Sequence, residues 1–80
     1  MLRKQTARGV VSLTEREQQI ISLIWKGLQN RDIATELRIS QKTVEAHRAS
    51  MMRKLRVTNA AQLLKQGFEQ GFLQQPNRAA

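Results

Sequence analysis

The stretch Ser40–Leu55, SQKTVEAHRASMMRKL, has the spacing of an amphipathic helix on which the rest of the fold depends. Because successive helical residues turn by about 100°, Val44, Met51 and Leu55 fall on one side, which we expect to face a core. The other side sets short residues among charged ones: Lys42, Glu45, Ala46, Ala49 and Arg53. An exposed helix face with so little bulk indicates that something large comes close to it.

A first helix is predicted upstream of this stretch. Thr14-Glu15-Arg16-Glu17 has the form of a capping box, in which Thr14 caps the amide of Glu17 and Glu17 reaches back. The apolar residues that follow at helical spacing are Ile20, Ile21, Leu23 and Ile24. We expect Gly27 to end this helix and Leu28 to fold back onto Leu23.

Two shorter helices complete the prediction. Asn30 is the expected cap of a short second helix, and Ser40 caps the third after a tight connection at Arg38 and Ile39. The second helix should bury Ile33, Ala34 and Leu37. Asn59 begins a fourth helix, whose expected inward residues are Ala60, Leu63, Leu64 and Phe68. The sequence therefore predicts an all-α fold, a compact four-helix bundle whose second and third helices form a helix-turn-helix and whose fourth packs on the core.

Eighty residues suffice for one small domain. Residues 1–11 are basic and aperiodic and indicate a flexible arm or the end of a linker, residues 12–73 form the predicted domain, and residues 74–80 indicate a disordered tail.

Composition narrows the classes of partner and activity. Fourteen Lys and Arg against six Asp and Glu give a net charge of +8, which favours a polyanion, either nucleic acid or an anionic membrane surface. Apolar runs of two or three residues exclude a membrane span and a signal-peptide core, so we expect a cytoplasmic protein. With one histidine and no cysteine, the sequence offers no metal set and no catalytic group, and we expect no cofactor and no enzymatic activity.

Residues 13–64 closely resemble the DNA-binding domain of the LuxR family, also called the FixJ/NarL effector domain. The marks of the resemblance are Leu13-Thr14, Arg16-Glu17, Gly27-Leu28, Asn30, Ile33-Ala34, Leu37, Ile39-Ser40, Thr43-Val44, His47, Lys54-Leu55 and Val57. Trp25 departs from it, because the family usually carries a smaller residue there. The resemblance implies that the third helix enters the DNA major groove and that the fourth commonly forms the dimer contact. It also implies an upstream regulatory domain, so the chain is either an excised domain or a stand-alone regulator.

Candidate base-reading residues lie on the low-profile face of the third helix. A helix fits a groove about 12 Å wide only if its leading face is slim, and Ala46 and Ala49 are placed to touch thymine methyl groups. Glu45 is a candidate acceptor for a cytosine amino group. The alternatives are that the alanines merely favour helix formation and that Glu45 pairs with Lys42 or Arg48.

Candidate phosphate contacts surround that face: Lys42, Arg48, Arg53, Lys54, Arg56 and, more weakly, Arg31. A solvated basic face is the alternative for all of them. Thr43 reaches either a phosphate or the carbonyl of Ile39. His47 lies at the edge of the side of this helix that carries Val44, Met51 and Leu55, and we expect it to be a half-buried structural residue.

The main functional hypothesis is sequence-specific binding of double-stranded DNA by the output domain of a transcriptional regulator, of the response-regulator type. A homodimer joined through the fourth helix would place two third helices about 34 Å apart on a pseudo-palindromic operator. RNA polymerase is a further candidate partner. The alternatives are a promoter-binding helix-turn-helix like that of a sigma factor and a basic protein-interaction adaptor.

Overall fold

Four helices follow one another along residues 12–73, the part of the chain that the computed structural model describes. They are α1 (Glu15–Trp25), α2 (Asn30–Leu37), α3 (Gln41–Leu55) and α4 (Ala60–Glu69). No strand occurs in this described part, so the predicted all-α class is confirmed. The predicted basic arm and disordered tail lie outside the described residues.

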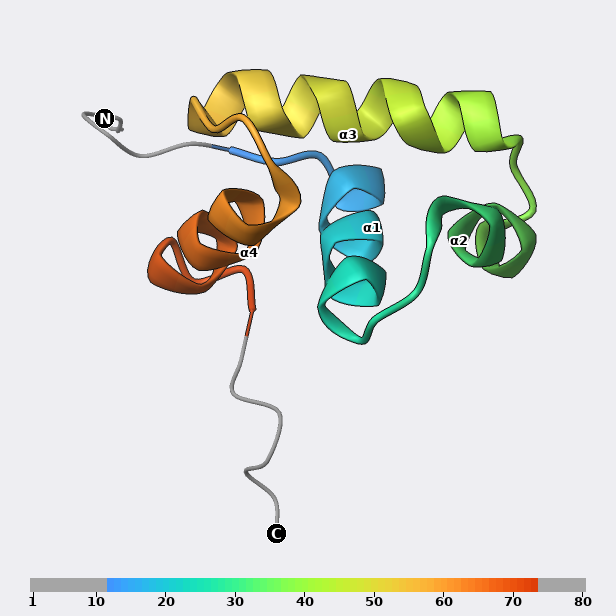
Figure 1. The fold of residues 1–80 in the computed structure, drawn as a ribbon, viewed down its shortest axis with the longest axis horizontal. Coiled ribbons are helices and arrows are strands. Elements are labelled where there is room, and N and C mark those ends of the chain that lie inside the picture. Colours follow the sequence, from blue (N-terminus) through green and yellow to red (C-terminus); the bar gives the residue numbers. More distant parts are fainter. Residues whose placement is uncertain (1–11, 74–80) are drawn as a thin grey trace, which may run out of the picture.

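Helix α3 lies across the domain and packs against each of the other three (Figure 1). Helix α1 runs beneath it, with α2 and α4 on either side. The buried core that joins the four helices consists of Leu13, Ile20, Ile21, Ile24, Ile33, Ala34, Val44, Met51, Leu55, Leu63 and Leu73. This arrangement turns one side of α3 inward along its length and leaves the other side to the surface.

Polar caps begin the helices, and three of the four predicted caps are confirmed. Thr14, Ser40 and Asn59 each accept a hydrogen bond from the backbone amide three residues on. The predicted cap at Asn30 is wrong, because Asn30 is the first helical residue of α2 and Gln29 is the cap. The side chain of Asn30 is instead turned toward α3, where it accepts a hydrogen bond.

Each helix ends with a backbone reversal of the Schellman type. After α1, Gly27 has a φ of 96° and the amide of Leu28 donates to the carbonyl of Leu23 at 3.1 Å, as the sequence predicts. The ends of α2 and α3 differ from the end of α1, because an arginine occupies the left-handed position where glycine is usual. Arg38 after α2 and Arg56 after α3 have φ values of 60° and 57°.

The prediction that Phe68 of α4 lies in the core is wrong. Phe68 is 41 % exposed, and its ring stacks on that of Trp25 with the centroids 6.4 Å apart. The reason lies one residue earlier, because Gly67 is the residue that faces the core, against Ile21. A side chain there would displace Ile21, since a Cβ on Gly67 would lie 2.6 Å from Cδ1 of Ile21. The fourth helix does pack on the core, as predicted, and its aromatic residue covers Trp25 at the surface.

Candidate nucleic-acid interface

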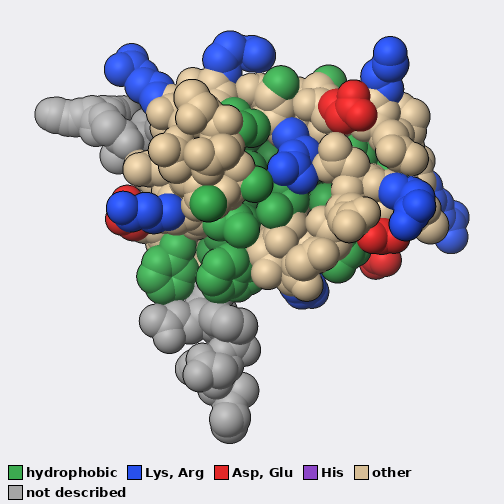
Figure 2. Space-filling view, viewed as in Figure 1, with side chains coloured by type: hydrophobic (Ala, Val, Ile, Leu, Met, Phe, Trp, Pro, Cys, Tyr) green, Lys and Arg blue, Asp and Glu red, His purple; other side chains and the backbone are tan. Residues whose placement is uncertain are grey.

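The two sides of α3 are as different as its sequence predicts. Val44 and Met51 are fully buried and Leu55 is 6 % exposed. On the opposite side all five predicted residues are exposed: Lys42, Glu45, Ala46, Ala49 and Arg53. In Figure 2 Lys and Arg side chains project along the edge of the molecule that α3 forms, with hydrophobic side chains lying low between them. This edge combines positive charge with a low profile.

The first turn of α3 is held by a pair of hydroxyl groups. The amide of Thr43 donates to Oγ of Ser40 at 3.0 Å, and the two side-chain oxygens lie 2.9 Å apart. The hydroxyl of Thr43 therefore pairs with Ser40, and no bond from it to the carbonyl of Ile39 is seen. Thr43 remains exposed at the end of the helix.

Glu45 stands alone among cations on the exposed face. Within the described part of the chain it forms no ion pair, either with Lys42 or with Arg48, although both are three residues away. Arg48 points elsewhere, since its Nη1 donates to Oδ1 of Asn30 at 2.9 Å. The carboxylate of Glu45 is thus an open acceptor in the middle of the low-profile face.

The six candidate cations fall into two groups. The side chains of four are exposed and form no hydrogen bond or ion pair with any described residue: Arg31, Lys42, Arg53 and Arg56. The other two are tied to neighbouring helices, Arg48 to Asn30 of α2 and Lys54 to Glu17 of α1. Sequence reasoning missed both ties, because each joins residues far apart in the chain.

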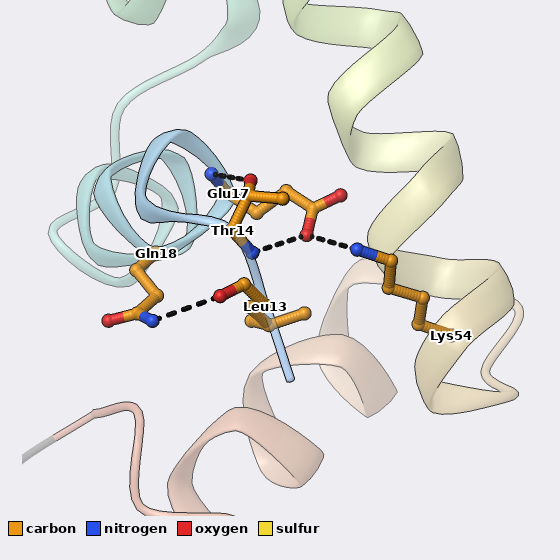
Figure 3. A network of polar contacts seen from close by, with 5 residues as sticks. All are labelled: Leu13, Thr14, Glu17, Gln18 and Lys54. Atoms are coloured by element: carbon orange, nitrogen blue, oxygen red, sulfur yellow. Dashed lines mark hydrogen bonds and ion pairs between the residues drawn. The ribbon is translucent and has the colours of Figure 1, made fainter. Parts of the chain in front are cut away.

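Glu17 lies at the centre of the network that anchors the end of α3 to the start of α1 (Figure 3). It is 2 % exposed, and its Oε1 accepts from the amide of Thr14 at 2.9 Å and from Nζ of Lys54 at 2.7 Å. Burial by itself would raise the pKa of this carboxyl, but hydrogen bonds from Lys54, Thr14 and Ser50 outweigh it, and the pKa is lowered. The lowered pKa keeps Glu17 charged at neutral pH, and its contact with Lys54 ties the end of α3 to the start of α1.

His47 is half-buried at the edge of the buried side of α3, as predicted. Among residues 12–73 no three His, Cys, Asp or Glu side chains gather in a way that would hold a metal ion. No helix in the same range is long and apolar enough to cross a membrane.

A groove of about 810 Å³ opens beside the face, between the start of α2 and the start of α4. Apolar residues of α1, α4 and the α1–α2 loop line it together with the cations Arg31 and Arg48. Helices α2 and α4 do not pack against each other, which leaves this space open beside α3. No carboxylate lines the groove, so its potential is positive.

Comparison with protein families gives a match over most of the chain. The model described as "Bacterial regulatory proteins, luxR family" matches residues 11–65. The transcriptional regulatory protein FixJ of Rhizobium meliloti is 41 % identical over 61 residues, which cover 76 % of this chain and 30 % of FixJ. The transcriptional regulatory protein UhpA of Escherichia coli is 42 % identical over 57 residues, covering 71 % of this chain and 29 % of UhpA. The chain thus spans about a third of the length of these relatives.

Solved structures share the arrangement of the helices. The transcription factor GerE superposes with a TM-score of 0.75 at 34 % identity, covering 78 % of this chain and 92 % of GerE. A Vibrio cholerae VqmA structure, described as a dimer in the absence of target DNA, superposes with a TM-score of 0.75 at 32 % identity. That match covers 85 % of this chain and 31 % of VqmA.

Proposed function

Because the chain belongs to the LuxR family of bacterial regulatory proteins, we propose that it binds double-stranded DNA sequence-specifically, with α3 in the major groove. Its relatives FixJ and UhpA are named transcriptional regulatory proteins and are about three times as long. The chain acts as the output domain of such a regulator, in the cytoplasm where the DNA lies. We assign it no catalytic step and no cofactor.

The exposed pair Ala46 and Ala49 is the observation that carries this proposal. A helix about 10 Å across its side chains enters a groove about 12 Å wide only where its leading residues are short. The cations on either side of the alanines supply the attraction to phosphate. On a purely solvated face, short residues at these two positions would bring only the helix propensity of alanine.

Contacts divide into those that read bases and those that set position. Glu45, Ala46 and Ala49 face the base edges, with Glu45 accepting from a cytosine amino group. Phosphate contacts come from the cations and the exposed hydroxyl around them: Lys42, Thr43, Arg48, Arg53, Lys54, Arg56 and Arg31. Lys54 can serve while paired with Glu17, because an ammonium has three donors and its side chain is 36 % exposed.

The bound form is a homodimer joined through α4. Phe68 on α4 is exposed and already stacked on Trp25, so the helix offers an aromatic surface to a second copy. Two copies would place their α3 helices about 34 Å apart, on the two halves of a pseudo-palindromic operator. RNA polymerase is a further partner that we propose for the assembled regulator.

Binding-site selection from a random duplex pool, followed by mobility-shift titration over a range of salt, tests the proposal. We expect affinity for the selected duplex to fall steeply with salt and to exceed affinity for a scrambled duplex by at least about 10³-fold. Ala49→Leu should abolish the preference, and Gln19→Leu, on the exposed side of α1, should leave base selection unchanged. A selected site with a single half-element would favour the sigma-like alternative. Equal binding to both duplexes would overturn sequence-specific recognition.

A further inference from the structure

Arg48 differs from Lys42 and Arg53 of α3 in being held by another helix. Its Nη1 donates to Oδ1 of Asn30 across 2.9 Å, between residues 18 apart in the chain. Arg48 is half-buried, whereas Lys42 and Arg53 are exposed. The hydrogen bond therefore fixes the guanidinium at the boundary between the low-profile face and the start of α2.

Asn30 is free to make this bond because its side chain does not cap α2. The amide of Gln29 donates to Oδ2 of Asp32 at 3.4 Å, and Asn30 itself is the first helical residue. Its carboxamide oxygen then has no capping role to fill. The side chain of Asn30 is therefore turned toward α3, where its oxygen accepts the hydrogen bond from Arg48.

The remaining donors of Arg48 are open to a ligand. A guanidinium carries five N–H groups, and within residues 12–73 Arg48 donates only to Asn30. Arg48 and Arg31 line the same groove, which has no carboxylate in its wall. The guanidinium is thus held in one place, and most of its N–H groups have no partner among residues 12–73 and are available to an anion.

We propose that Asn30 is a positioning residue. It holds Arg48 ready to bind one backbone phosphate of the DNA, on the side of α3 that faces α2. This inference rests on the DNA binding proposed above. A free arginine loses much of its rotamer freedom when it binds a phosphate, and a side chain ordered beforehand avoids that loss on association. Asn30 therefore increases affinity without touching DNA itself.

Titration of the 80-residue chain with its selected duplex, at several salt concentrations, tests the role of Asn30. Asn30→Ala should weaken binding by roughly three- to tenfold and leave the salt slope unchanged, because the charge of Arg48 remains. Arg48→Ala should weaken binding further and reduce the slope by about one. The double variant should bind as weakly as Arg48→Ala alone. Gln19→Ala, an exposed change of similar size on α1, should have no effect.

A purely structural role for Asn30 predicts a different pattern. The loss from Asn30→Ala would then be as large in the Arg48→Ala background as in the wild type, and that result would overturn the proposal. Side-chain NMR of the free wild-type protein gives a test that needs no variant. We expect the Nε–H of Arg48 to be as rigid as the backbone of α3, and a mobile Arg48 would also overturn the inference. Failure of every duplex to bind would instead contradict the proposed function.

Discussion

The carboxylate of Glu17 and the ammonium of Lys54 join the first turn of α1 to the last turn of α3 across 2.7 Å. The side chain of Glu17 is 3 % exposed, so its charge depends on this partner and on nearby donors. Lys54→Met should therefore lower the free energy of unfolding by about 1–3 kcal/mol, because a buried charge loses a donor. Urea unfolding measures the change. Lys65→Met, an exposed change on α4, is the matched control, and an equal loss in both variants would contradict the role of the ion pair.

Lowering the pH should reduce the free energy of unfolding of the domain, because it protonates the same carboxyl of Glu17. The pKa of Glu17 is lower in the folded chain than in the unfolded chain, so the unfolded chain binds the proton first as the pH falls. The stabilisation is therefore complete above the ordinary glutamate value of about 4.3 and is lost as the pH drops through the lower, folded value. In Glu17→Gln the free energy of unfolding should be smaller at pH 7 and should fall less below pH 5. A decline as steep as in the wild type would show that other carboxyls govern the acid response.

Local signals along the chain predicted the helices well, because caps and reversals involve neighbours within five residues. The capping box of Thr14 and the reversal at Gly27 are both of this kind. Apart from the cap of α2, which is Gln29 and not Asn30, the errors concern contacts between helices. Nothing near Lys54 in the sequence indicates Glu17, 37 positions earlier. The inward placement of Phe68 also failed, since helical spacing cannot reveal that Ile21 fills the space beside Gly67.

The close contact between Gly67 and Ile21 predicts an unusual response to alanine. In most helices Gly→Ala stabilises by about 0.5–1 kcal/mol, but here the new methyl group would meet Cδ1 of the fully buried Ile21. Gly67→Ala should therefore destabilise the domain by about 1 kcal/mol or more. Ile21→Val removes the clashing carbon, so the double variant should be more stable than the sum of the two single changes. Additive losses in thermal or urea unfolding would contradict this packing.

Arg38 and Arg56 offer a matched pair for separating stability from binding. Both have left-handed backbones that cost a residue with a side chain about 1–2 kcal/mol, and both side chains are exposed. Each change to glycine should raise the free energy of unfolding by about 0.5–1 kcal/mol, since the greater freedom of the unfolded chain offsets part of the gain. Only Arg56→Gly should also weaken DNA binding and reduce the salt slope. Equal effects of the two variants on the slope would remove Arg56 from the phosphate contacts.

The unpaired carboxylate of Glu45 predicts a change in base preference on its removal. It is exposed on the low-profile face without an ion-pair partner among the described residues, so it repels phosphate unless a base amino group meets it. Glu45→Ala should lose about 1–3 kcal/mol of discrimination at one base pair, while total affinity for scrambled duplex stays equal or rises. Binding-site selection with both proteins, followed by titration of each selected duplex, measures the two quantities. Glu36→Ala on α2 is the control and should select the wild-type site. A uniform loss by Glu45→Ala on every duplex would mean that the carboxylate supports the helix and reads no base.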